Sequence, residues 1–350
     1  MYILIAILIF GILIAVHEFG HFITAKLFGV RVLEFSIGMG PLLLKKQGKE
    51  TLYSLRLLPI GGFCAMEEDE ASDDPRAFPN QSLPKKFLIL AAGAGMNFLL
   101  GFALLLVVIA GGNTQSNEIT GFLEGCPYES ETGLQAGDEV LKIDGHSVLV
   151  ASDIAGYLNR GERHDITVLR NGEKVTLEDF QIKPLEYPGQ AAPMYGFELL
   201  GKVEGIGQTV RYAWNQSCYF VRMVWMSLRS LATGEYGVKD LSGVVGIVDI
   251  ISAEGKEIAE RAGVYAAFLS ISNFAAFIAI NLAVMNLLPI PALDGGRIFF
   301  LLILWPVEKL MKRKLDPKYE GYIHTAGLVL LMGLMVYVMF NDILRIVGRL

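Results

Sequence analysis

The chain has 350 residues, of which 53% are hydrophobic and only 19% charged, and its net charge is −6. Soluble domains carry about 25% charged residues, and nucleic-acid-binding proteins usually present a basic surface, so the composition excludes a soluble enzyme and a nucleic-acid-binding protein. Three cysteines without a CxxC pair fit neither a disulfide framework nor a cysteine metal site.

The hydrophobic residues are concentrated in long blocks. A helix needs about 20 apolar residues to cross a bilayer, and four segments are near or above that length. They are Tyr2–Phe28, Phe87–Ala110, Val264–Leu288 and Ile323–Phe340. Ile298–Val307 is too short to cross and is predicted to form a short or re-entrant helix. The first block has no Lys or Arg before Lys26, which argues against a cleaved signal peptide.

Basic residues define the expected orientation of these spans. Lys and Arg gather in the loop between the first two spans and in the loop between the last two, at Arg31, Lys45, Lys46, Lys49, Lys85, Lys86, Lys309, Lys312, Arg313, Lys314 and Lys318. Gly111–Leu141 contains neither. Because cytoplasmic loops are enriched in Lys and Arg, both basic loops are predicted to face the cytoplasm, with the 111–262 segment outside the cell.

Two stretches outside the spans have the pattern of strands. Phe35–Pro41 and Leu52–Phe63 predict short strands joined by Gly and Pro, and such backbone beside a span must be buried in protein or face a water-filled cavity. Residues 115–200 predict a small β-rich domain with a strand at Glu139–Gly145, a helix at Ala151–Asn159 and an Asn-Gly hairpin at Asp165–Leu177.

The Gly-Leu-x-x-Gly-Asp run of that region, with Tyr195–Phe197 as a closing strand, resembles a PDZ domain. The following segment, residues 205–263, mixes Trp and Tyr with apolar and basic residues. It predicts amphipathic helices lying at the membrane surface, or a helix packed on the PDZ-like domain.

The first span contains the motif His17-Glu18-Phe19-Gly20-His21. On a helix, His17 and His21 lie on one face and can bind one zinc ion, while Glu18 is placed beside the ion to take a proton from water. Ionisable groups inside a span are costly and are functional hypotheses by default. The alternative is a polar cluster that only packs helices together.

A catalytic zinc takes three protein ligands and keeps one position open. Asp294, in a Pro/Gly-rich segment just after the third span, is the best third ligand, ahead of His324 at the start of the fourth span. Asp294 has an alternative role as the cap of the next helix. A metal transporter would need further polar residues in the spans, and the second span offers only Asn97.

Together these features resemble the bacterial site-2 proteases, intramembrane zinc metalloproteases of the regulator-of-sigma-E type. The similarity extends over nearly the whole chain and includes FSIGMGP, LRLLPIGGF, SISNFAAFIAINLAVMNLLP and NLLPIPALDGGR. It implies zinc (Zn2+) bound by His17, His21 and Asp294, with Glu18 as general base. It also implies that substrate is held by Asn281 and Asn286 and by a membrane-embedded β-hairpin that contains Gly61 and Gly62.

The expected fold is therefore a mainly α polytopic membrane protein with four transmembrane helices, the membrane-embedded β-hairpin and an inserted PDZ-like domain. Four parts are predicted. Residues 1–111 hold the first two spans, 112–204 an extracytoplasmic PDZ-like domain, 205–263 interfacial helices, and 264–350 the last two spans. The resemblance implies the bacterial inner membrane, with the active site toward the cytoplasmic side.

The resemblance further implies the partners. Substrates are expected to be single-pass membrane proteins, such as anti-sigma factors or signal-peptide remnants, cut after an upstream site-1 protease has acted; membrane lipid is a partner and nucleic acid is not. The alternative function is a membrane-anchored PDZ binding module with a structural zinc site. Ala94 and Val244 stand where the family usually has proline, which puts substrate gating and choice in question.

Overall fold

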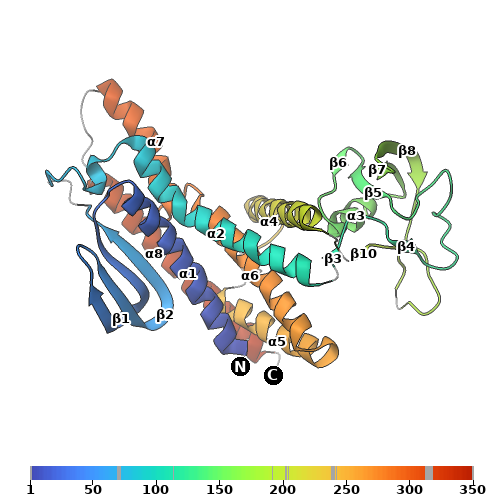
Figure 1. Ribbon diagram of the computed structural model, residues 1–350, viewed down its shortest axis with the longest axis horizontal. Coiled ribbons are helices and arrows are strands. Elements are labelled where there is room, and N and C mark those ends of the chain that lie inside the picture. Colours follow the sequence, from blue (N-terminus) through green and yellow to red (C-terminus); the bar gives the residue numbers. More distant parts are fainter. Residues whose placement is uncertain are drawn as a thin grey trace. The chain divides into compact units, whose positions relative to one another are not determined.

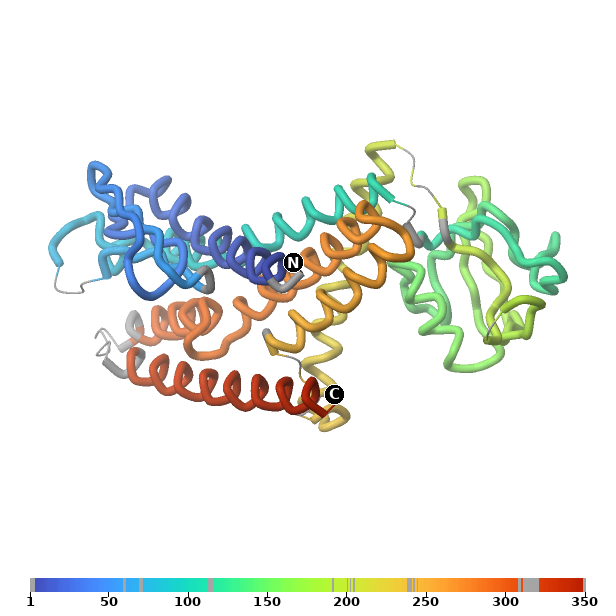
Figure 2. The backbone as a smooth tube through the Cα atoms, turned by 90° about the horizontal axis from the view of Figure 1, so that it is seen from below, coloured from blue at the N-terminus to red at the C-terminus, as the bar shows by residue number. Residues whose placement is uncertain are grey.

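The computed structural model describes residues 2–68, 72–112, 114–190, 192–201, 203, 205–237, 241, 243–311 and 318–348. It contains two compact units, Met1–Leu104 with Met223–Leu350, and Leu105–Arg222. Figures 1 and 2 follow the chain through both. Part of the second predicted basic loop, Lys312–Lys314, lies outside the described residues.

The four predicted spans are confirmed as long helices: α1 (Tyr2–Leu27), α2 (Leu83–Gly111), α6 (Val264–Asn286) and α8 (Lys318–Val347). Among the described residues these four are long and apolar enough to cross a bilayer. The predicted short helix is longer than expected, because α7 runs over Asp294–Met311 and contains Pro306. Only 6% of the most apolar window of α8 is buried, so most of the surface of this helix is exposed.

Strands β1 (Val32–Gln47) and β2 (Leu52–Met66) form one long antiparallel hairpin, so the prediction of short strands was wrong in length. The hairpin is bent back on itself. As a result, residues 34–37 of β1 pair with residues 52–55 of β2 on one side and with residues 62–65 of β2 on the other. Gly61, with φ +102°, sits where the register shifts. By this register, residues 62–65 form an outer edge of the sheet.

The second unit contains the predicted β-rich insert. Its strands are β3 (Thr114–Gln115), β4 (Gly121–Phe122), β5 (Glu139–Ile143), β6 (His146–Ser147), β7 (Arg163–Arg170), β8 (Glu173–Gln181), β9 (Phe197–Glu198) and β10 (Leu200–Gly201), with helix α3 at Ala151–Leu158. The main sheet has the order β6-β5-β7-β8, and β4 pairs with β9. The predicted strand, helix and hairpin are confirmed, while the PDZ assignment stays a prediction.

The insert is held by an aliphatic core and one buried ion pair. Ile143, Ile154 and Ile166 are among the buried side chains that pack between α3 and the sheet. Asp138, which is fully buried, accepts hydrogen bonds from Arg170 Nε at 2.8 Å and Nη2 at 2.7 Å. Because a buried carboxylate without its partner is costly, this pair fixes the loop before β5 to the end of β7.

Two further helices, α4 (Ile206–Thr233) and α5 (Val244–Ala262), follow the insert. The N-terminal half of α4 packs on the insert, since Arg211 pairs with Glu139 at 3.0 Å and Arg222, further along the helix, pairs with Asp153. This agrees with the second of the two alternatives for the segment. Helix α5 packs on α1 and α6, with Ile251 among the buried side chains there.

The insert also carries a buried histidine whose protonation stabilises it. His164 Nδ1 lies 2.7 Å from Asp144 Oδ2, and Nε2 lies 3.1 Å from the carbonyl oxygens of Leu158 and Gly161. Burial opposes the charge on His164, but these three acceptors outweigh it and raise its pKa. A raised pKa in the folded state stabilises the fold at low pH and loses that contribution as pH rises.

We therefore expect the contribution of His164 to the stability of the insert to be complete below about pH 6.5, the unfolded pKa of histidine, and to be lost as pH rises through the higher folded pKa of His164. Hydrogen exchange of the β7 amides in the full chain, corrected for intrinsic rates, measures this. His164→Gln should remove the pH dependence over that window. An unchanged dependence in the variant would contradict this account of the histidine.

Candidate metal centre

The centre lies where α1 crosses α2 at two glycines. A Cβ on Gly20 would fall 2.4 Å from the Ala92 carbonyl oxygen, so the two backbones touch here. A Cβ on Gly93 would fall 2.5 Å from His21 Nε2 and 2.7 Å from His17 Cε1. Glycine at both positions therefore lets the helices approach and leaves room for the two imidazoles.

Three side chains converge on one point beside this crossing. Asp294 Oδ2 lies 3.1 Å from His17 Nε2 and 3.2 Å from His21 Nε2, and the two Nε2 atoms are 3.2 Å apart. The three side chains are 12%, 8% and 19% exposed, so water is largely excluded. The structure thus brings the three predicted ligands into one cluster.

The cluster fits a zinc ion. Ligands about 2.0–2.1 Å from a tetrahedral ion lie about 3.3 Å from one another, close to the three spacings observed. Asp294 Oδ2 is buried and accepts no hydrogen bond from any described residue, although two ring nitrogens are near it. Two imidazoles and one carboxylate are also the donor set of known catalytic zinc sites. These three atoms are therefore close enough together to share one ion.

The outer nitrogen of His21 has a fixed partner. Its Nδ1 lies 2.8 Å from the Ile89 carbonyl oxygen of α2, and because a carbonyl only accepts, Nδ1 carries the proton. Nε2 is then left with a lone pair that faces Asp294 and His17. Such outer contacts set the tautomer and orientation of metal-binding imidazoles.

A strained turn presents Asp294 to the histidines. Ala292, two residues earlier, has φ +77°, which is unfavourable for any residue with a Cβ. His324 of α8 holds this turn, because its Nδ1 accepts the Ala292 N–H at 3.0 Å. His324 is therefore a support for the turn and is not part of the ligand cluster. Asp294 does begin α7, but its Oδ2 faces the imidazoles.

Glu18 lies between this cluster and the edge of β2. It is within electrostatic range of both histidines and of Asp294, and the Cys64 backbone hydrogen-bonds to its carboxylate. A Cβ on Gly62 would fall 3.5 Å from Glu18 Cγ. The hairpin therefore fixes the position of the predicted general base.

Three further predicted site residues lie in α6 and in the hairpin. Asn281 lies within α6 and Asn286 is its last residue. Both side chains are half-buried, and neither makes a hydrogen bond within the described part of the chain. Gly61 would place a Cβ 2.7 Å from the Met39 side chain, so it is constrained by the hairpin itself.

Sequence reasoning missed the contribution of α2. Ile89 and Gly93 touch the histidines directly, and the Asn97 amide faces His17. The one available signal was the run of small residues at Ala91–Gly95, which is unusual in a span of large aliphatic side chains and indicates close helix packing.

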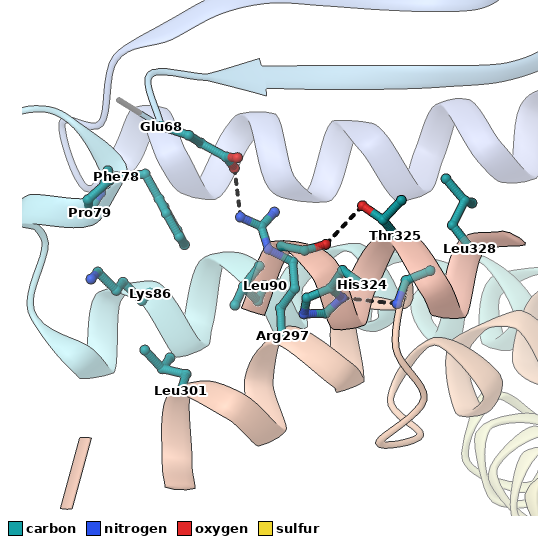
Figure 3. Close-up of a pocket in the computed structure, with 12 residues that line it drawn as sticks. Glu68, Phe78, Pro79, Lys86, Leu90, Arg297, Leu301, His324, Thr325 and Leu328 are labelled. Carbon is teal, nitrogen blue, oxygen red and sulfur yellow. Dashed lines mark hydrogen bonds and ion pairs between the residues drawn. The ribbon is translucent and has the colours of Figure 1, made fainter. Parts of the chain in front are cut away.

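A cavity of about 530 Å³ opens beside the turn that presents Asp294 (Figure 3). Its lining includes Glu68, Phe78, Lys86, Arg297 and His324. Arg297 pairs with Glu68 at 2.8 Å and lies over the Phe78 ring. Because Arg297 is in the first turn of α7, this contact ties the start of that helix to the chain that follows β2.

Comparison with known proteins adds an independent result. The family model described as peptidase family M50 matches residues 5–334. A protein of Clostridium acetobutylicum that bears a zinc metalloprotease name is 39% identical over 347 residues, which cover 97% of each chain. The zinc metalloprotease RasP of Shouchella clausii is 30% identical over 430 aligned positions, covering 97% of this chain and 98% of the relative.

Proposed function

This chain belongs to peptidase family M50 and is a membrane-embedded zinc metalloprotease of the site-2 type, and we propose that it cleaves single-pass membrane proteins within their transmembrane segments. The observation that carries the proposal is the position of Glu18, between the three-ligand cluster and the outer edge of β2. A peptide on that edge would pass beside the general base.

The substrate must first lose its helix. A transmembrane helix hides every peptide group in its own hydrogen bonds, so the scissile bond is exposed only after local unwinding. Residues 62–65 pair with β1 on one side only, and the Cys64 backbone on the other side already reaches Glu18. An unwound segment added to this edge as a strand would satisfy its backbone groups there.

The chemistry divides between the metal and the chain. His17, His21 and Asp294 would hold the zinc ion, which would supply a Lewis acid for the scissile carbonyl and for a nearby water. Glu18 takes the proton of the attacking water and passes it to the leaving amine. The free amides of Asn281 and Asn286 have the donors and acceptors needed to hold an unwound backbone.

A transmembrane substrate with and without helix-breaking residues tests the proposal. We expect the purified protein in vesicles to cut a single-pass peptide faster when Gly or Pro interrupts its helix, because unwinding then costs less. Mass spectrometry of the products locates the cut. Cleavage confined to the soluble flanks, or independent of the helix breaker, would contradict the proposal.

The insert is proposed to act as a PDZ-like size filter on the extracytoplasmic side, admitting substrates already trimmed by a first protease. The support is its folded β core and its position in a segment with few basic residues at its start. Anti-sigma factors and signal-peptide remnants are substrates of the expected kind, and the bacterial inner membrane is the expected location.

Deletion of residues 115–200 tests the filter. We expect the deleted protein to cut a substrate that retains its bulky external domain, which the full chain should leave intact. Cleavage of a pre-trimmed substrate serves as the control, because it should proceed at a similar rate in both proteins. If the untrimmed substrate remains intact after the deletion, the filter hypothesis is wrong.

A further inference from the structure

The side-chain amide of Asn97 in α2 is buried but has few hydrogen-bond partners. Asn97 is 1% exposed within an otherwise apolar span, and its Oδ1 is buried without a hydrogen-bond partner among the described residues. Its Nδ2 lies 3.5 Å from His17 Nδ1, and this is the only hydrogen bond that the side chain makes within the part of the chain that the structure describes. Burying an amide with so few partners is unfavourable, so a contribution to helix packing does not account for it.

Asn97 lies beside the outer nitrogen of His17, as Ile89 lies beside the outer nitrogen of His21. Residues eight apart on a helix are about two turns apart and share one face, and this face of α2 meets α1 at Gly93. Ile89 accepts the outer N–H of His21, and Asn97 lies at the outer nitrogen of His17. Helix α2 therefore has a group at the outer nitrogen of each imidazole.

We propose that Asn97 is a positioning residue that accepts the Nδ1 proton of His17 through its amide oxygen. His17 Nε2 lies within 3.2 Å of the other two ligand atoms. To bind the ion that the three atoms share, Nε2 must present a lone pair, so the ring proton is on Nδ1. A donor then faces Asn97, and the amide presents oxygen to it. The two ends of an amide have the same shape, so this orientation needs no repacking.

This contact has a specific chemical consequence. It fixes the tautomer and ring plane of His17 with a neutral acceptor, and so adds no further charge to the span. Loss of such an outer partner lowers metal affinity by about 10–100-fold in known zinc sites. This role of Asn97 deepens the proposed function and rests on zinc binding at this cluster. Zinc affinity is measured without substrate, so the test of Asn97 does not depend on the proposed substrate class.

Zinc affinity and zinc-free stability of two matched variants test the proposal. Asn341 is another span asparagine with a buried, unpartnered Nδ2, but it lies in α8 and outside the cluster. We expect Asn97→Leu to weaken zinc binding by about 10–100-fold, measured by competition with a chromophoric chelator, while the metal-free protein unfolds at the same or a higher temperature. Asn341→Leu should leave zinc affinity unchanged.

A second variant keeps the test independent of folding. Asn97→Asp retains an acceptor at the same place, so we expect its zinc affinity to remain within about threefold of the parent or to exceed it. Lower stability of the metal-free Asn97→Leu protein with unchanged zinc affinity would show a merely structural role and overturn the proposal. An Asn97→Asp protein that binds zinc as weakly as the leucine variant would also overturn it.

Discussion

Glu18→Gln is expected to abolish proteolysis while zinc stays bound. The amide keeps the size of the carboxylate and is not one of the three clustered ligands, so the metal site should remain intact. It has no basic oxygen able to take a proton from water, and loss of a general base costs about 10²–10⁴-fold in rate. Peptide cleavage and zinc content, measured on the same preparation, separate the two effects.

Two controls make this result decisive. Glu254→Gln makes the same substitution on an exposed position of α5 and should leave both cleavage and zinc content unchanged. Asp294→Ala should lose zinc as well as activity, because it removes a ligand. Full activity of the Glu18→Gln protein would exclude the base assignment. Loss of zinc from it would mean that Glu18 holds the metal site together.

Adding a single methyl group to α2, in Gly93→Ala, is expected to have an effect as large as that of Glu18→Gln. In Gly93→Ala the new Cβ would meet His21 Nε2 at 2.5 Å and His17 Cε1 at 2.7 Å. The helices have no room to separate without cost, because Gly20 already packs against the Ala92 backbone. We expect both imidazoles to move and zinc affinity to fall by more than about 100-fold, given that ligand geometry tolerates only a few tenths of an ångström.

Gly95→Ala is the matched control on the same helix. No atom lies within 4 Å of a Cβ at this position, so zinc affinity should stay within a few-fold of the parent. Both substitutions favour the helix by about 1 kcal/mol, so a difference between them cannot come from helix propensity. Chelator competition measures both proteins. Parent-like affinity in Gly93→Ala would mean that the imidazoles do not lie against α2.

Local patterns were sufficient to predict much of the fold. The four spans follow from apolar length alone, and the Asn171-Gly172 pair placed the hairpin of the insert correctly because its turn requires those residues. The β1–β2 hairpin was underestimated. Its strands continue through Gly and Pro positions that ordinarily end strands, and only the bent pairing along both halves of β2 explains their length.

The candidate metal centre likewise combines features that a local pattern predicts with features that depend on how the helices pack. The His17 and His21 spacing predicts a shared ion because both belong to one helix. The positions of Gly93 and Asn97 against these histidines depend on how α1 crosses α2, and no local pattern gives that contact. The support of the Asp294 turn by His324 was missed for the same reason, since the two segments are about 30 residues apart.

Anomalous scattering at the zinc edge, from crystals of the purified protein, shows whether His17, His21 and Asp294 together bind the zinc ion. We expect one strong peak within about 2.0–2.2 Å of His17 Nε2, His21 Nε2 and an Asp294 carboxylate oxygen. A peak elsewhere in the chain, or zinc bound by the two histidines while Asp294 points away from them, would contradict it.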